Sequence, residues 1–268
     1  MAGAANALAF GANEVLARRL RLVATAGLAA GPALLIHDLG RPDRFLKMFR
    51  TVKVTSPMSV GTWVLGAAGT ASGTATALDV IGRLPRVRAA AEAGAALLGL
   101  PVSTYTAALV AQSSIPVWHE ARRELPFVFA ASSAASAGAA GIVFTPAVHA
   151  RPARRLAVLG GLAELGAVRW MERRLGDFLA EPYHEAEAGR YAKLAKASTA
   201  AGTLVTALAG RRRPGALVGG ALLLAGSAFE RWAVFKAGFQ GAEDPKYVVE
   251  PQRARLRRRD ALRSRVDR

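Results

Sequence analysis

Three places in the sequence combine polar side chains with apolar surroundings in a way that could support chemistry. Glu164 lies in the middle of the apolar stretch LAVLGGLAELGAVRWMERRLG. His37 and Asp38 are adjacent at the end of another stretch, and Tyr105 follows Pro101 inside a third. A carboxylate or an imidazole can exchange protons, and a phenol can donate a hydrogen bond to a carbonyl group. The pattern therefore indicates proton exchange beside a polar ligand, provided that these segments come together.

Each of these residues also has a structural interpretation, which the sequence leaves open. Glu164 is either a protonatable relay residue or the ion-pair partner of an arginine from another helix, because an isolated charge at the centre of a membrane helix costs about 2.5–3.5 kcal/mol. Tyr105 could bind a quinone carbonyl, or it could pack at an interface. His37 and Asp38 could bind a ligand head group, or they could cap their helix and reach toward water.

Long uncharged segments position these residues. Residues 93–118 and 125–150 contain no Asp, Glu, Lys or Arg, and residues 56–82 contain only Asp79. Apolar stretches of about 18 or more residues are typical of transmembrane helices, and small residues let such helices approach closely. An Ala-rich soluble helical protein is disfavoured, because so many windows are hard to bury in water. The expected helices are 2–17, 19–38, 57–82, 88–113, 125–148, 153–175, 191–210 and 214–237.

The sequence thus predicts an all-α fold, a polytopic membrane helix bundle of about seven full transmembrane helices plus a truncated first helix. Residues 1–240 are expected to form the bundle, and residues 241–268 an extramembrane basic tail. The net charge of +17 is concentrated in arginine groups between the apolar windows. Such charge in a membrane protein is usually topogenic or lipid-facing, so nucleic-acid binding is disfavoured.

The residue composition limits which redox groups the chain can carry. It contains no cysteine, so it has no disulfide, no thiolate nucleophile and no cysteine-ligated iron–sulfur cluster. Its four histidines offer no good pair in the middle of the membrane, so a haem is not expected. No Walker loop, zinc-protease motif, nucleophile elbow or dinucleotide fingerprint is present. Any redox centre is therefore expected in another protein, with no covalently bound cofactor here.

The connections between the expected helices alternate in character. One set is short and basic, and the positive-inside rule predicts that it is cytoplasmic. The other set, at 38–55, 119–124, 176–190 and after 237, mixes acidic and basic residues and is expected on the outer face. This mixed face could be solvated loops or a docking surface. The candidate docking residues are Arg44, Lys47, Arg50, Lys53, His119 and Glu120.

Several ordered motifs resemble the membrane subunit of polysulfide reductase and its NrfD-like relatives. They are DLGRPDRF followed by TSPMSVGTW, then YTAALVAQSSIPVWHEARRELPFVFA, ERRLGDFLAEPY and FKAGFQGAEDPKYVVEPQR, over nearly the whole chain. The resemblance implies an integral subunit of about eight helices in the inner or plasma membrane, without metal or haem. It also implies binding of a quinone, commonly menaquinone, near an iron–sulfur subunit that contacts a molybdopterin catalytic subunit.

The resemblance and the polar residues together give a specific site hypothesis. Asp38 or His37 would exchange protons, Tyr105 would hydrogen-bond the quinone, and Arg41 would order the loop or pair with Asp38. Glu164 would relay protons. Relative to the family pattern the first helix looks shortened at AGAANALAF, which bears on a site that this helix helps to line. The rivals are a purely structural anchor for the iron–sulfur partner and a transporter.

Overall fold

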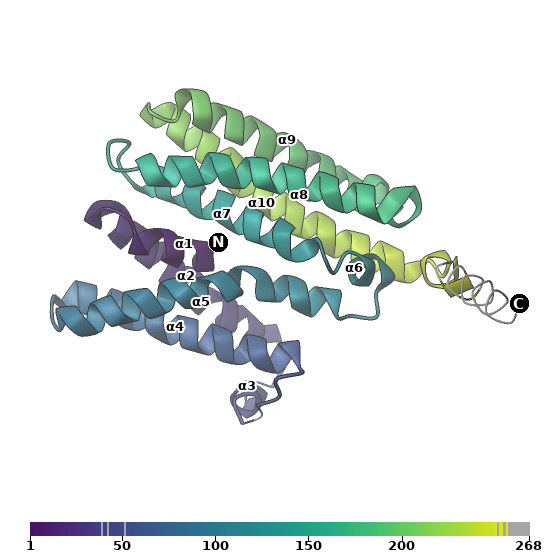
Figure 1. The fold of residues 1–268 in the computed structure, drawn as a ribbon, viewed down its shortest axis with the longest axis horizontal. Coiled ribbons are helices and arrows are strands. Elements are labelled where there is room, and N and C mark those ends of the chain that lie inside the picture. Colours follow the sequence, from purple (N-terminus) through teal and green to yellow (C-terminus); the bar gives the residue numbers. More distant parts are fainter. Residues whose placement is uncertain (39, 42, 51, 251, 254–255, 257–268) are drawn as a thin grey trace, which may run out of the picture.

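The computed structural model describes the chain apart from residues 39, 42, 51, 251, 254–255 and 257–268, and apart from the side chains of Asp43, Arg44 and Leu46. The described residues form helices with no strand among them, which confirms the predicted all-α class (Figure 1). The helices are α1 (Ala2–Phe10), α2 (Glu14–Asp38), α3 (Asp43–Met48), α4 (Pro57–Ile81), α5 (Pro85–Ala111), α6 (Pro116–Glu120), α7 (Leu125–Phe144), α8 (Arg151–His184), α9 (Ala186–Ala209) and α10 (Arg213–Glu243).

Five of these helices are long and apolar enough to cross a membrane, namely α2, α4, α5, α7 and α10. The expected count of seven full spans is therefore not confirmed. The expected segments 153–175 and 191–210 are helical, within α8 and α9, but these helices are not apolar enough to be counted with the five. The expected first helix at 2–17 is divided, because a turn at 11–13 separates α1 from α2.

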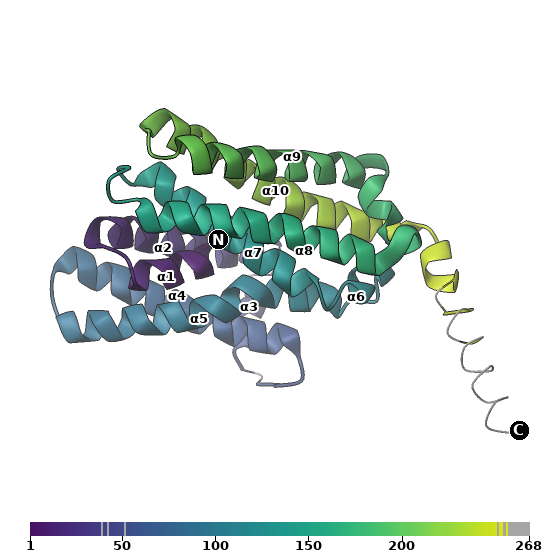
Figure 2. The same ribbon diagram turned by 45° about the horizontal axis from the view of Figure 1, so that its top comes forward.

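The helices form two groups, with α1 between them (Figures 1 and 2). The first group contains α2, α4 and α5, and the second contains α7, α8, α9 and α10. Helix α1 contacts α2 and α5 of the first group and α7 of the second. Glycines allow close packing in the second group: a Cβ atom at Gly202 of α9 would lie 2.8 Å from the backbone nitrogen of Leu223 in α10. The contacts of α1 with both groups show that this short helix lies in the seam between them.

The connections lie at two ends of the bundle, as their alternating charge predicts. The α1–α2, α4–α5, α7–α8 and α9–α10 connections share one end, which we call the arginine end (Figure 1). Asn13 Nδ2 donates to His149 O at 2.9 Å, and Arg154 Nη1 donates to Gly210 O at 3.4 Å, so these connections touch. Helices α3 and α6 and the α8–α9 connection lie at the opposite, mixed-charge end. Which end faces the cytoplasm stays a prediction.

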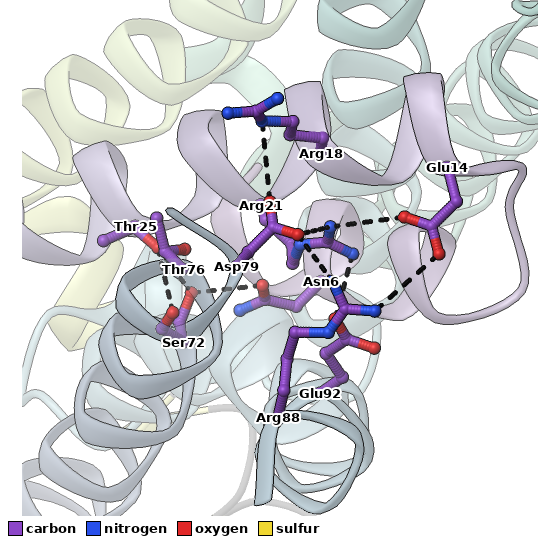
Figure 3. Close-up of polar contacts among 10 residues, drawn as sticks. All are labelled: Asn6, Glu14, Arg18, Arg21, Thr25, Ser72, Thr76, Asp79, Arg88 and Glu92. Carbon is purple, nitrogen blue, oxygen red and sulfur yellow. Dashed lines mark hydrogen bonds and ion pairs between the residues drawn. The ribbon is translucent and has the colours of Figure 1, made fainter. Parts of the chain in front are cut away.

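A polar network ties α2, α4 and α5 together at the arginine end (Figure 3). The side chain of Arg21 is only 6% exposed and lies 3.1 Å from both an Asp79 oxygen and a Glu92 oxygen. Arg88 also pairs with Asp79, at 2.7 Å. Farther along α2, Thr25 Oγ1 lies 2.8 Å from Thr76 Oγ1 of α4. These buried charges have direct partners, as a structural role requires.

The chain beyond α10 folds back onto the mixed-charge end. Tyr247 is buried, and its ring centroid lies 5.3 Å from that of Phe178 in α8. Its hydroxyl donates to Glu181 Oε2 at 2.9 Å, and Lys246 Nζ donates to Glu181 Oε1 at 3.2 Å. These bonds hold the pKa of Glu181 below its usual value, with Lys246 the larger cause. The start of the expected basic tail is therefore docked on the bundle, while the expected boundary at residue 240 stays a prediction.

Candidate functional site

A cavity of about 420 Å³ lies among α1, α2, α4 and α5, and a side chain from α10 reaches its wall. Apolar residues make up most of the lining, including Leu28, Leu35, Met58 and Leu109. Leu35 lies near the end of α2, Met58 near the start of α4 and Leu109 near the end of α5, so the cavity lies toward the mixed-charge end. A mostly apolar cavity of this size with few polar groups is typical of a small-molecule site.

Tyr105, predicted as a ligand-binding residue, lines this cavity. It is half-buried in α5, opposite Gly61 of α4. A Cβ atom at Gly61 would lie 2.7 Å from Tyr105 Cδ2, so glycine is the residue that gives the ring its place. Within the described part of the chain the Tyr105 hydroxyl makes no hydrogen bond, which leaves it able to donate to a ligand. Its predicted role in binding remains a prediction.

Arg231 of α10 also lines the cavity and supplies its positive charge. Its guanidinium carbon lies 5.0 Å from the centroid of the Phe129 ring, which holds the side chain by a cation–π contact. The charges of Glu164 and Glu230 both act on Arg231. The guanidinium therefore connects the cavity electrostatically with two carboxyl groups inside the second helix group.

Sequence reasoning missed Arg231 and Glu230 as site residues, because both were placed near the end of the last helix. That helix was expected to stop at residue 237, whereas α10 continues to Glu243. Residues 230 and 231 are consequently well inside the helix. The sequence does contain a signal for this site, because an acidic and a basic residue are adjacent in an apolar segment. Such charges need a partner or a function.

Glu164, the predicted proton-relay residue, is buried in α8 with 2% of its surface exposed. Both of its carboxylate oxygens lack a hydrogen-bond partner among the described residues. Ser132 lies beside Glu164 and donates its own hydrogen bond to Ser227 Oγ at 2.9 Å. Glu230 is 4% exposed, and the charge of Glu164 acts on it. Neither Glu164 nor Glu230 forms a direct ion pair among the described residues.

The other predicted quinone ligands lie at the mixed-charge end outside the cavity lining. His37 and Asp38 are the last residues of α2 and are exposed, and Arg41 is exposed in the following connection. The structure brings Tyr105 to the cavity and leaves these three at the surface near it. Their part in ligand binding stays a prediction.

The candidate docking residues also lie at the mixed-charge end. Lys47, Arg50 and Lys53 are exposed in or after α3. His119 and Glu120 belong to α6 and line a second cavity, of about 360 Å³, beside Tyr247. Arg44 lies in α3, but its side chain is outside the described residues. The predicted docking residues therefore come from two separate parts of one end.

No metal site is formed by the described residues, among which no three His, Asp or Glu side chains are grouped closely enough to hold an ion. The sequence contains no cysteine. Together with the five candidate spans and the apolar cavity, this describes a multi-pass helical membrane protein with a small-molecule cavity among its helices.

The comparison with known families identifies the group to which this membrane protein belongs. Residues 1–178 match the sequence model of the family described as "Polysulphide reductase, NrfD". The chain therefore belongs to the NrfD polysulphide reductase family. The match includes Tyr105 and Glu164 and ends within α8, so Glu230 and Arg231 lie outside it. No curated protein matches the chain.

Proposed function

We propose that this chain is the quinone-reactive membrane subunit of a polysulfide reductase-like oxidoreductase complex in the inner or plasma membrane. It would anchor an iron–sulfur subunit, exchange electrons with the quinone pool, commonly menaquinone, and contact a molybdopterin catalytic subunit through that partner. The observation that carries the proposal is the apolar cavity, whose wall includes Tyr105 and Arg231.

The cavity suits the chemistry of a quinone. A quinone has an apolar ring with carbonyl acceptors, and the cavity offers apolar walls with Tyr105 and Arg231 as possible donors. Thr62 and Ser103 add hydroxyl groups to the lining. When bound, a quinone would carry both electrons and protons. In this arrangement the protein residues orient the ring and exclude water from it.

The buried acids are the proposed source of protons. Glu164 is buried without a hydrogen-bond partner among the described residues, so it gains little from being ionised there. Arg231 interacts with Glu164 and with Glu230 and also borders the cavity. In this proposal, a proton held at a Glu164 carboxylate oxygen moves toward the cavity wall. Arg231 sets the local charge along that route. This assigns Glu164 the relay role and adds Glu230 as its partner.

The mixed-charge end is the proposed docking site of the iron–sulfur subunit. Exposed Lys47, Arg50 and Lys53 give one side of this end a positive charge. The cavity lies toward the same end, which shortens the path for electrons between a docked partner and the bound quinone. Exposed His37, Asp38 and Arg41 lie on this surface, where they could order the loop or help the partner dock.

Binding of a water-soluble menaquinone analogue to the purified chain tests the proposal. Quenching of tryptophan fluorescence reports binding, because Trp63 of α4 follows Thr62 in the cavity lining. Tyr105→Phe should weaken binding about 3- to 10-fold, which is the worth of one hydrogen bond. Tyr191→Phe, the same change on α9, is the matched control and should leave affinity unchanged.

Two results would count against quinone binding in this cavity. Absence of saturable quenching in the unmodified chain would favour the structural anchor, which holds the partner without touching quinone. Equal affinities of the unmodified chain and both tyrosine variants would show that the Tyr105 hydroxyl does not bind the ligand.

A further inference from the structure

Six arginines gather at the arginine end where α8, α9 and α10 begin or end. Arg154 Nη1 donates to Gly210 O at 3.4 Å, which joins the start of α8 to the end of α9. Arg213 Nη2 donates to Val143 O at 2.7 Å, which joins the start of α10 to the end of α7. We call this group the α8–α10 arginine cluster, consisting of Arg151, Arg154, Arg155, Arg211, Arg212 and Arg213.

The positive charge of this cluster has no internal compensation. None of its six arginines forms an ion pair with a carboxylate in the described part of the chain. The like charges of Arg211, Arg151 and Arg155 all act on Arg154. The first turns of α8 and α10 contain no acidic residue, so two positive helix ends add to the charge. A bound anion would lower the repulsion among these arginines.

The first helix group also carries arginines at this end, but acidic residues lie among them. There, Arg21 and Arg88 are paired with Asp79 and Glu92, while the nearby Arg19, Arg83 and Arg86 form no ion pair among the described residues. The α8–α10 arginine cluster differs because none of its six arginines has a carboxylate partner in the described part of the chain.

Exposed apolar side chains beside the cluster indicate what kind of partner it is. Phe144 and Val148 flank the α7–α8 connection and are 54% and 80% exposed. Leu208, one residue from the end of α9, is 78% exposed, and Val218 in α10 is 53% exposed. An anion-binding group bordered by exposed apolar side chains matches the boundary between lipid head groups and acyl chains.

We propose that the α8–α10 arginine cluster binds the phosphodiester head groups of anionic phospholipids. The planar guanidinium donates paired hydrogen bonds to phosphate oxygens and is well suited to this contact. Arg154 and Arg213 are anchored to backbone carbonyls, whereas Arg211 and Arg212 are exposed and make no side-chain hydrogen bond within the described part of the chain. The acyl chains would lie against the exposed apolar residues of α7, α9 and α10.

Lipid titration of the delipidated full chain, followed by native mass spectrometry, tests this proposal. Phosphatidylglycerol should bind with higher affinity than phosphatidylcholine. Each arginine near a membrane surface contributes roughly a fivefold factor, so Arg211→Gln with Arg212→Gln should weaken phosphatidylglycerol binding about 25-fold. The matched control is Arg173→Gln with Arg190→Gln, which removes equal charge from exposed positions outside the cluster and should change affinity little.

Three results would overturn the proposal. Equal affinity for phosphatidylcholine, whose head group has no net charge, would show that the cluster does not recognise the net negative charge of a lipid. Equal weakening by the control pair would show that net charge, and not this cluster, determines binding. Full competition by soluble glycerol phosphate at the concentration of the lipid would show a free-phosphate site. If Arg211→Gln with Arg212→Gln alters the thermal unfolding temperature, Arg151→Gln provides a second variant, which should weaken phosphatidylglycerol binding about fivefold.

Discussion

Arg21 of the first helix group and Glu164 of the second are both buried, but they differ in their partners. In α2, α4 and α5, the buried Arg21 lies 3.1 Å from an oxygen of Asp79 and from one of Glu92 (Figure 3). In α7 to α10, the buried Glu164 has no hydrogen-bond partner among the described residues. Paired buried charges keep a structure in register, whereas an unpaired buried acid costs stability and calls for another reason to be present. The first pattern indicates structure, and the second indicates function.

The location of the unpaired acids strengthens this contrast. Glu164 and Glu230 both interact with Arg231, and Arg231 borders the cavity that Tyr105 also lines. Asp79 lies near the end of α4, and Arg88 and Glu92 lie near the start of α5, at the arginine end. None of the three lines that cavity. A substitution in each group should therefore affect different properties of the protein.

Replacing Arg21 should produce the largest loss of stability. Arg21→Met leaves carboxylates at Asp79 and Glu92 with one cation fewer, and breaking a buried ion pair costs about 3–5 kcal/mol of unfolding free energy. Arg88 still pairs with Asp79, which favours the lower end of that range. Reversible unfolding in detergent measures the effect, and Arg83→Gln, at an exposed position nearby, is the control. Equal stability of Arg21→Met and the unmodified chain would contradict a structural role.

Replacing Glu164 should affect turnover rather than stability. Glu164→Gln removes a buried acid that has no hydrogen-bond partner, and Glu230 still offers its charge to Arg231, so the unfolding free energy should change little. Quinol-coupled turnover of the assembled complex should fall about 100-fold, as expected for loss of a proton-transfer group. Glu185→Gln, at an exposed position, is the control and should retain turnover. A destabilised Glu164→Gln protein with normal turnover would assign Glu164 to the structural class instead.

Filling the space opposite Tyr105 should have a moderate effect at the cavity. In Gly61→Ala, the new methyl group would lie 2.7 Å from Tyr105 Cδ2 and displace the ring. Overpacking of this kind costs about 1–3 kcal/mol, and affinity for the quinone analogue should fall with it. Gly69→Ala on the same helix has open space and should be neutral or slightly stabilising. Identical behaviour of the two variants would place Tyr105 elsewhere.

Acid should release the chain after α10 with little effect on the bundle. The folded pKa of Glu181 is below its usual value of 4.5, so its contribution to docking is complete above that pH. The contribution is lost as the pH falls through the lowered folded pKa. The protection of residues 244–250 against hydrogen exchange, relative to the intrinsic exchange rate at each pH, should therefore fall as the pH drops below 4.5. Glu181→Gln should show fast exchange at neutral pH as well, whereas Glu185→Gln should behave like the unmodified chain.

Sequence patterns predicted most of the helices, because uncharged windows bounded by arginine groups mark helices in a membrane. They also identified Tyr105 and Glu164 as candidate site residues, since a polar residue in an apolar window is conspicuous. They did not predict the association of Arg231 with Glu164, which depends on how α8 and α10 pack. Because the last helix was expected to end at residue 237, the sequence did not indicate that Glu230 and Arg231 lie near the middle of α10. The seven expected spans counted α8 and α9, which are not apolar enough to be counted with the five.

Photolabelling with a menaquinone analogue that carries an azide on its ring tests most directly whether the cavity among α1, α2, α4 and α5 holds a quinone. We expect labelled peptides from 58–65 and 102–109, the parts of α4 and α5 that line the cavity. Excess unlabelled quinone should prevent the labelling, and Arg231→Gln should reduce it about tenfold, as for loss of a charged hydrogen bond. Labelling outside these peptides, or labelling that neither excess quinone nor Arg231→Gln reduces, would contradict quinone binding in the cavity.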